Sequence, residues 1–331
     1  MSVMAFAVMS RRDFMAGTAS LAAVGGGATA RSDSRKHRLG ILVPTILPTR
    51  RASLLKALEA HGYREGENLA VEARTADGKL ERLPELAEEL VRADLDVIVA
   101  FTTPGTRAAI GTGTKIPIIM WAGDPVGSGF VSNMARPGGH VTGITDAAGA
   151  TATKRLAILR EVVPTARRIA VFFHPDFPIG TAQVGEIERS ARELDMAVRA
   201  FAIRDTLDDL RNAVEEAAAW PADAVLRVIA EGSLDFSRPQ AELLLAHRLP
   251  AMLVSPTDVR NGGLLSYFPD VSELYGALAA YVHRVMTGTS PGDLPVLFPT
   301  RFRLAVNLST AKALAITVPP TILAQADEVV E

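Results

Sequence analysis

Short apolar runs alternate with amphipathic segments along most of the chain. In the first part, strand-like runs are separated by segments whose apolar positions recur at helical spacing. This order, β-α-β-α-β-α-β, is typical of a parallel sheet covered by helices. The predicted strands are residues 39–44, 68–76, 95–101 and 116–122, and the predicted helices are residues 51–63, 82–94 and 104–111.

The same pattern restarts at Arg167. Because the unit recurs only twice at similar spacing, we expect two similar α/β lobes and not a solenoid. A long helix over 271–288 follows, and the tail at 302–323 adds one strand and a short helix. The second half has predicted strands at 167–173, 196–203, 222–230 and 249–255, and predicted helices at 182–195, 206–220 and 238–248.

The segment at 123–145 is rich in glycine and could be a phosphate loop, a mobile linker or the end of a lobe. We interpret it as the end of the first lobe, with a strand at 140–145 that leads to a hinge at 145–150. Its glycines would allow tight turns and positive φ angles. The expected first lobe is 31–147 plus about 262–296, the expected second lobe is 148–261 plus about 297–331, and a ligand cleft lies between them.

The composition of the chain argues against several classes of function. The 331 residues are 48% hydrophobic and carry a net charge of -2, which argues against nucleic-acid binding. The absence of cysteine excludes disulfides, thiol catalysis, cysteine-ligated metals and a lipoprotein anchor. No dinucleotide, Walker or G-x-S-x-G motif is present, and the six histidines lack metal-ligand spacing. We therefore expect neither an enzyme, a cofactor nor a metal site.

The N-terminus has the features of an export signal. Residues 10–15, SRRDFM, match the twin-arginine pattern, and residues 28–30, ATA, fit a cleavage site for small residues. The apolar run at 14–24 is about half the roughly 20 residues that a membrane-spanning helix needs. We expect residues 1–30 to be removed near Ala30 and the protein to be periplasmic, although an Arg-Arg pair can also occur by chance.

Polar residues follow the predicted strands of the first half, where ligands bind in open α/β sheets. Thr45 follows the first strand, and Thr102 and Thr103 follow the strand at 95–101. Thr103 is expected to be the N-cap of the next helix, with Pro104 at its first position. The N–H groups and positive dipole end there would suit a carboxylate, or the residues simply cap a helix.

Asp124 follows the strand at 116–122 and is a candidate for binding a ligand ammonium group, or it caps the next turn. Trp121 ends that strand as core or as a stacking wall. In the second half, Ser255 and Pro256 repeat the cap-then-proline arrangement. Each lobe should therefore present a capped helix and a carboxylate. The candidates of the second half are His174, Asp176, Glu231, Ser255 and Asp258.

Three segments carry a family resemblance: GDPVGSGFVSNMARPGGHVTGIT at 123–145, NGGLLSYFPDVSELYGALAAYV at 261–282, and the block at 294–331. In this order they resemble the extracytoplasmic solute-binding proteins of ABC transporters in the tryptophan-binding-protein-like family, over about residues 38–331. The chain departs from the family pattern at His140, at His174-Pro175-Asp176 and at Phe268. The Phe268 ring stands where glycine is usual, so the ligand need not be tryptophan.

The resemblance implies a type I periplasmic-binding fold: two Rossmann-like lobes with parallel sheets, a hinge and a ligand between them. It also implies a monomer that delivers a small organic solute to a membrane permease driven by an ATPase. In this interpretation the first-lobe helix binds an acid group, and Asp124 or Asp258 an amine. One alternative is a sensor that presents its ligand to a membrane receptor; another is an exported α/β enzyme.

Overall fold

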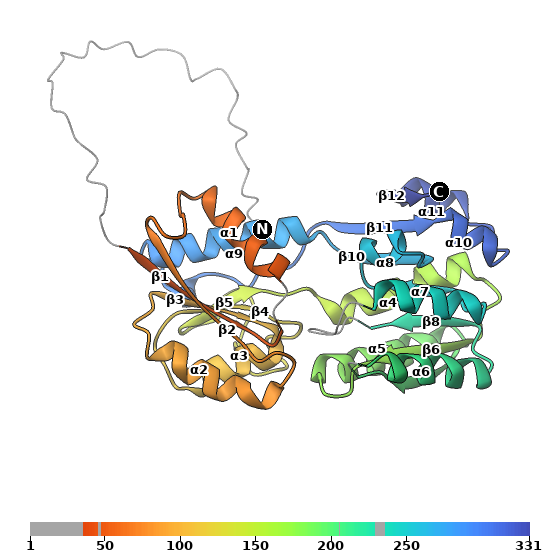
Figure 1. Ribbon diagram of the computed structural model, residues 1–331, viewed down its shortest axis with the longest axis horizontal. Helices are drawn as coiled ribbons and strands as arrows, with labels where there is room; N and C mark the ends of the chain where they lie inside the picture. Colours follow the sequence, from red (N-terminus) through yellow and green to blue (C-terminus); the bar gives the residue numbers. More distant parts are fainter. Residues whose placement is uncertain (1–35, 46–47, 205, 229–235) are drawn as a thin grey trace, which may run out of the picture. The chain divides into compact units, whose positions relative to one another are not determined.

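The computed structural model describes residues 36–45, 48–204, 206–228 and 236–331 (Figure 1). The expected export signal and Glu231 lie outside the described residues. Lys36–Glu331 form one compact unit with an α/β architecture, as the sequence predicts. No helix among the described residues is long and apolar enough to cross a membrane.

The first sheet is parallel throughout, in the order β2-β1-β3-β4-β5. Every residue of β3, β4 and β5 is buried, as expected for strands covered on both faces. The expected strand before the hinge is confirmed as β5. The strands are β1 (His37–Val43), β2 (Leu69–Thr75), β3 (Val97–Phe101), β4 (Ile118–Trp121) and β5 (Val141–Ile144).

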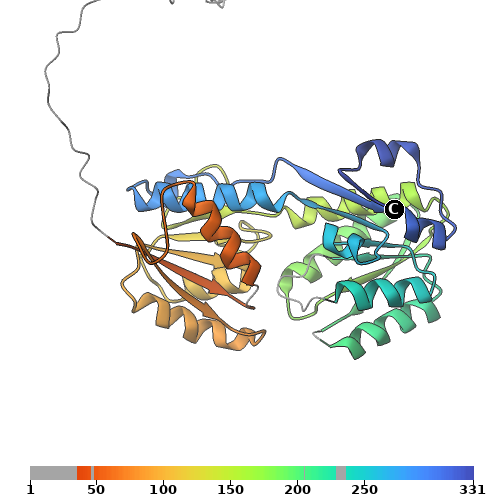
Figure 2. The ribbon, with the colours of Figure 1, turned by 45° about the horizontal axis from the view of Figure 1, so that its top comes forward.

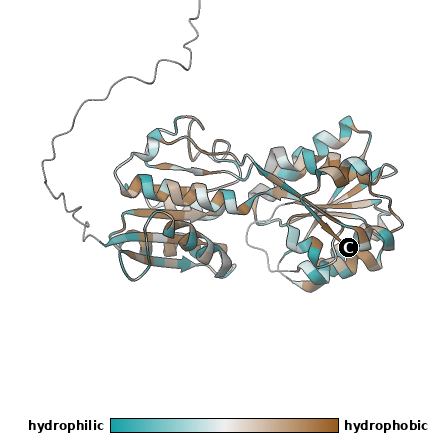
Figure 3. Cartoon of the chain, turned by 90° about the horizontal axis from the view of Figure 1, so that it is seen from above, coloured by the Kyte–Doolittle hydropathy of each residue, from teal (hydrophilic) through white to brown (hydrophobic). Residues whose placement is uncertain are grey.

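Helices cover both faces of the first sheet. On one face, α1 (Pro48–Glu59) packs beside α9 (Val271–Met286), which comes from far along the sequence (Figures 1 and 2). On the other face lie α2 (Leu83–Val91) and α3 (Thr102–Gly111). The helices carry both hydrophilic and hydrophobic residues, as expected for helices with one buried face (Figure 3).

The second sheet has the order β12-β11-β10-β9-β8-β6-β7. It is parallel except for the antiparallel pair of β10 and β11, so the expectation of parallel sheets holds for most of its strands. The strands are β6 (Arg168–Phe173), β7 (Ala197–Ala202), β8 (Ala224–Arg227), β9 (Ala251–Leu253), β10 (Leu265–Pro269), β11 (Phe302–Asn307) and β12 (Glu328–Val330).

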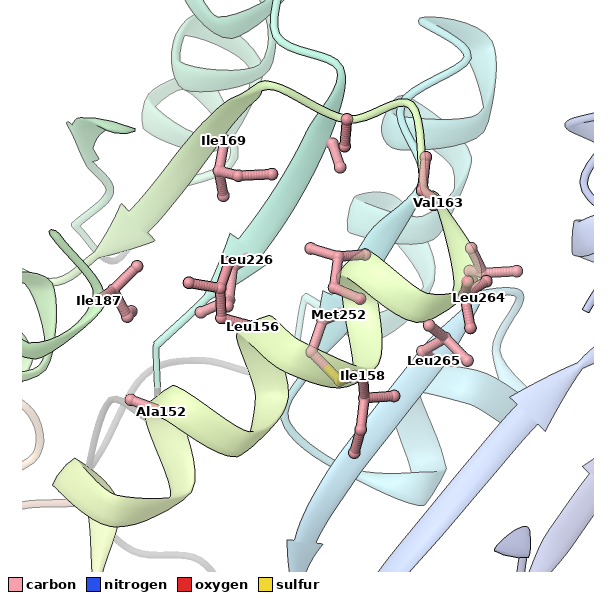
Figure 4. Close-up of a cluster of buried hydrophobic side chains, with 14 of the residues drawn as sticks. Ala152, Leu156, Ile158, Val163, Ile169, Ile187, Leu226, Met252, Leu264 and Leu265 are labelled. Atoms are coloured by element: carbon pink, nitrogen blue, oxygen red, sulfur yellow. The ribbon is translucent and has the colours of Figure 1, made fainter. Parts of the chain in front are cut away.

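Both faces of the second sheet also pack against helices. Apolar side chains of α4 and α5 form one core with the strands (Figure 4), and α6 and α7 form the other. Short helices complete this part of the chain. The helices are α4 (Ala148–Val162), α5 (Pro178–Glu193), α6 (Leu207–Ala219), α7 (Ser237–Ala246), α8 (Pro256–Arg260), α10 (Leu308–Ala313) and α11 (Pro320–Gln325), with 3-10 turns η1 (Leu80–Arg82) and η2 (Pro291–Asp293).

Four elements differ from the sequence-based expectation. Helix α4 was not predicted, although Ala152, Leu156 and Leu159 form an apolar stripe at helical spacing. Strand β10 lies in the second sheet, whereas the expected boundary at residue 262 places it in the first lobe. The reason is that β10 pairs with both β9 and β11. The tail contains α11 and β12 in addition to the one strand and one helix expected.

The chain passes between the sheets near Asp146, near Asp270 and near Thr300. These passages are hydrogen-bonded to one another: Thr145 N–H donates to Leu297 O (2.9 Å), and Asp270 N–H donates to Arg301 O (2.9 Å). Just before the first passage, Gly143 has a φ of 147°. A Cβ atom there would lie 2.0 Å from Met120 O, so only glycine fits against β4.

Candidate functional site

A pocket of about 730 Å³ is lined by residues from the strands, helices and turns of both sheets. We call it the Arg50 pocket. Its volume lies in the range of small-molecule sites in proteins. The residues that line it include Arg50, Trp121, Asp146, Arg227, Phe236, Ser237, Val254, Ser255, Asp258, Arg260, Phe268, Asp270, Arg303 and Glu328.

One wall combines a cation with aromatic rings. The Arg50 guanidinium carbon lies 5.7 Å from the Phe101 ring centre and 5.9 Å from the Trp121 ring centre. Trp121 in turn lies 5.2 Å from Tyr275 in an edge-on arrangement. Among the described residues Arg50 has no hydrogen bond or ion pair, so its positive charge is not neutralised by an acid. Trp121 is therefore both core and pocket wall, the two alternatives that the sequence left open.

Tyr275 supports this aromatic cluster as a neutral side chain. Burial raises the pKa of Tyr275 to about 12, against the opposing effect of the Arg50 charge. The phenol therefore keeps its proton throughout the physiological range. The positive charge at this wall belongs to Arg50 alone.

The opposite wall has a second cation, Arg227, whose side chain donates to Gln240 Oε1. Behind it lies Arg155 of α4, which has no exposed surface. Its Nη2 donates to the carbonyls of Arg227 and Leu253, where β8 and β9 end. Burial lowers the pKa of Arg155 to about 9, against the opposing charge of Asp258, so the group remains cationic at neutral pH. Arg155 thus joins the ends of the two strands that carry this wall.

Ser255 and Asp258 both line the Arg50 pocket, and the predicted cap-then-proline start of α8 is confirmed. Ser255 Oγ accepts from Asp258 N–H (3.2 Å), and Asp258 Oδ2 accepts from Ser255 N–H (2.8 Å). Together they form a capping box. Asp258 Oδ2 also accepts from Ser255 Oγ (2.9 Å), so this carboxylate already has several donors.

Two other arginines of the pocket, Arg303 and Arg260, are paired with acids. Arg303 Nη2 lies 3.0 Å from Asp270 Oδ2, and Arg260 contacts both carboxylate oxygens of Glu328 at 2.6 and 2.7 Å. Hydrogen bonding from Ser272, and then from Arg303, lowers the pKa of Asp270, so this acid is ionised near neutral pH. Arg50 therefore differs from these arginines, whose charges are balanced within the chain.

The remaining predicted site residues that the structure describes do not line the Arg50 pocket. Thr103 and Asp176 line a second pocket of about 580 Å³, between α2 and α3, and Asp124 lines a third of about 440 Å³. Asp124 is exposed, and its Oδ1 accepts from Gly127 N–H (2.9 Å), so it caps the next turn. Thr45, Thr102 and His174 line none of the three pockets.

The predicted cap of α3 is wrong. The helix begins at Thr102, one residue before the expected N-cap, and Phe101 at the N-cap position makes no side-chain hydrogen bond. Thr102 has a φ of 73°, an unusual value for a β-branched residue, and its Oγ1 accepts from Gly105 N–H (3.3 Å). Thr103 is 3% exposed inside the first turn.

His174 is buried against a neighbouring ring and not directed at a pocket. Its imidazole lies 4.7 Å from the Phe177 ring centre, edge-on, and its Nδ1 accepts from Asp176 N–H (3.2 Å). The Asp176 carboxylate is 3.6 Å from Arg204. His174 and Asp176, both expected at the site, thus interact with each other and with Arg204 near the turn after β6.

Sequence reasoning missed Arg50, Asp146, Arg155 and Arg227. A signal existed for Arg155, because it interrupts the apolar stripe of α4 and a charged residue on a buried face needs a reason. Arg50 precedes the first helical turns of the predicted helix and has no such signal. Among the described residues, no group of three or more histidine, aspartate or glutamate side chains could hold a metal ion.

The sequence of this chain is similar to known proteins over most of its length. A family model described as ABC transporter substrate binding protein matches residues 44–330. The chain is 27% identical over 290 residues to a tyrosine-binding protein of Clostridioides difficile (strain R20291), covering 86% of this chain and 83% of that protein.

Two solved structures share the fold. A conserved domain protein from Vibrio cholerae superposes with a TM-score of 0.82 at 24% identity, covering 89% of this chain and all of the other. An ABC domain in complex with L-Trp from Streptococcus pneumonia gives a TM-score of 0.79 at 22% identity, with 89% and 100% covered.

Proposed function

We propose, from the premise that this chain belongs to the ABC transporter substrate-binding protein family, that it captures a small organic carboxylate in the Arg50 pocket. The family binds solutes and does not transform them, and we propose no catalysis here. Export to the periplasm through residues 1–30, and delivery by a monomer to a membrane permease with its ATPase, complete the proposal.

The observation that carries this proposal is the unbalanced charge of Arg50. A guanidinium on a pocket wall, with no acid partner in the described chain, suits a planar carboxylate because it can donate two parallel hydrogen bonds. The nearby rings of Trp121 and Phe101 hold the cation without neutralising it. The acid group of the ligand is thus proposed at Arg50 and not at the start of α3.

The other lining residues suit the rest of such a ligand. Trp121, Phe236 and Phe268 provide aromatic surface, and Asp146 is a buried acid at the passage between the sheets. Tyrosine and L-Trp, named for the two relatives, each contain a carboxylate, an ammonium group and a ring. We propose Asp146 for an ammonium group where the ligand has one, in place of Asp124 or Asp258.

We propose that the two lobes close around the ligand, because the Arg50 pocket is lined by elements of both sheets. Arg50 and Trp121 belong to the elements of the first sheet, whereas Arg227 and Ser255 belong to those of the second. We propose that the two sheets with their helices are the lobes. A ligand that touches both walls favours the closed arrangement by the difference between its affinities for the two states.

A thermal-shift screen of amino acids, aromatic acids and small organic acids tests the proposal. Ligand at about 100 times Kd should add roughly 2.7 kcal/mol to the free energy of unfolding. Arg50→Gln should weaken binding by about tenfold to a hundredfold, because it removes charged hydrogen bonds worth about 1.5–3 kcal/mol.

Arg51→Gln is the matched control. Arg51 is the next residue of α1, but it pairs with Glu65 at 2.5 Å and does not line the pocket. Its loss should leave affinity unchanged. Equal affinities of the Arg50→Gln variant and the unmodified chain for every ligand found would refute the assignment.

A further inference from the structure

Two of the pockets are separated by a small apolar cluster. Phe177 is 3% exposed and packs against Leu80, Val254 and Phe268. Leu80 lines the second pocket, whereas Val254 and Phe268 line the Arg50 pocket. We call these four side chains the apolar partition, because they lie between spaces of about 730 and 580 Å³.

The partition is assembled from elements of both sheets. Leu80 begins the η1 turn that precedes α2, on the side of the first sheet. Phe177 precedes α5, Val254 follows β9 and Phe268 lies in β10, all on the side of the second sheet. Movement of one sheet against the other therefore makes or breaks the contact of Leu80 with Phe177.

Phe177 is held in place from behind. The buried His174 ring contacts it edge-on at 4.7 Å. Phe177 N–H donates to His174 O (3.4 Å), and Phe177 O accepts from Gly180 N–H (2.9 Å). The Phe177 ring is therefore packed between His174 on one side and the other three partition residues on the other.

The second pocket lies beyond the partition and has its own lining. The second pocket has apolar sides from Leu83 and Ala108, and charged groups from Glu85, Glu88 and Arg107. A ligand that reached it from Arg50 would have to displace four packed apolar side chains. Such displacement costs packing energy that the ligand must supply.

We infer that the apolar partition limits the length of the ligand and thereby selects compact carboxylates over extended ones. This inference rests on the proposed carboxylate site at Arg50. A compact ligand ends in apolar contact with Phe268 and Val254, whereas a longer one meets the partition. Truncating Leu80 or Phe268 should join the two pockets and admit the longer ligand.

The test uses phenylalkanoic acids of increasing chain length, from phenylacetate through 3-phenylpropionate to 5-phenylvalerate and 6-phenylhexanoate, measured by calorimetry. For the unmodified chain, affinity should fall by about tenfold or more beyond the length that the pocket accepts. In Leu80→Ala and Phe268→Ala this drop should disappear, and the longer acids should bind at least as tightly as the shorter ones.

Phe298→Ala is the control, since Phe298 is 56% exposed and lines only the third pocket. It should keep the length dependence of the unmodified chain. Each variant is also paired with Arg50→Gln. If binding depends on Arg50 but Leu80→Ala and Phe268→Ala keep the length dependence of the unmodified chain, the role of the partition is overturned and the carboxylate site is not. Failure of every acid to bind in an Arg50-dependent way would overturn the proposed carboxylate site, and with it this inference.

Discussion

Helices α3 and α8 begin with similar sequences but are built differently. Thr103-Pro104-Gly105-Thr106 and Ser255-Pro256-Thr257-Asp258 each offer a hydroxyl residue followed by proline. At α8 the hydroxyl is the N-cap of a reciprocal capping box. At α3 the helix begins one residue earlier, and its N-cap makes no side-chain hydrogen bond.

The fourth residue explains the difference. Asp258 is an acceptor that reaches back to the N–H groups of Val254 and Ser255 (3.2 and 2.8 Å). Thr106 is placed at the same spacing, but its Oγ1 donates to Ala100 O (3.4 Å). A carboxylate can complete the cap, whereas a hydroxyl turns to the preceding strand. The comparison teaches that the oxygens of an acid after a strand can accept hydrogen bonds from backbone N–H groups. Such an acid has fewer oxygen lone pairs left to bind a ligand.

The largest effect is expected at Asp258. Asp258→Ala removes the acid half of the capping box and leaves the partly buried N–H groups of Val254 and Ser255 without this acceptor, so it should lower the free energy of unfolding by about 3 kcal/mol. Thr106→Ala, its counterpart in α3, should cost about 1 kcal/mol or less. Urea unfolding of both variants gives the two values. Equal losses would contradict the different roles of the two positions.

A smaller effect is expected at Thr102, where the left-handed backbone is strained. Thr102→Gly and Thr102→Ala both lose the hydrogen bond to Gly105 N–H. Glycine also relieves the strain, so the Thr102→Gly variant should be about 1 kcal/mol more stable than the Thr102→Ala variant. At Thr103 the order should reverse, because alanine is favoured over glycine in a helix. Thermal unfolding of the four variants tests this reversal, and its absence would argue against strain at Thr102.

A third helix start adds a pH test. Asp270 is the N-cap of α9, and Ser272 and then Arg303 hold its pKa below the ordinary 3.8. A folded pKa below the unfolded one contributes stability above the unfolded value, and this stability is lost as pH falls through the folded value. Below about pH 4, the free energy of unfolding of Asp270→Asn should therefore fall less than that of the unmodified chain. The difference should be under about 1 kcal/mol. Unchanged acid sensitivity would contradict this role for Asp270.

Much of the fold could be predicted from the sequence because buried parallel strands leave long apolar runs. Strands β3 and β4 lie within the predicted ranges, and the restart of the pattern predicted at Arg167 marked the second sheet, whose β6 begins at Arg168. Helix α4 was missed because Arg155 breaks its apolar stripe. The position of β10 depends on its pairing with β11, about forty residues later, which local pattern cannot show.

Less of the site could be predicted. Ser255 and Asp258 were placed at the pocket because they belong to the segment that follows a predicted strand, and the ends of parallel strands share an edge. Asp124, Thr103 and Asp176 also follow strands, yet they line other pockets. The direction of each side chain after a strand depends on the turn that follows. Arg50 comes from a helix and had no pattern to mark it.

The two tryptophans allow the most direct test of the central claim, that the ligand binds against Trp121 beside Arg50. Trp121 lines the Arg50 pocket, whereas Trp220 packs near Phe201 with 6.2 Å between ring centres. In Trp220→Phe the fluorescence comes from Trp121 alone. Titration with the carboxylate that gives the largest thermal shift should change this emission in a saturable way, and Arg50→Gln should abolish the change. Calorimetric binding with no change in Trp121 emission would place the ligand elsewhere and contradict the account.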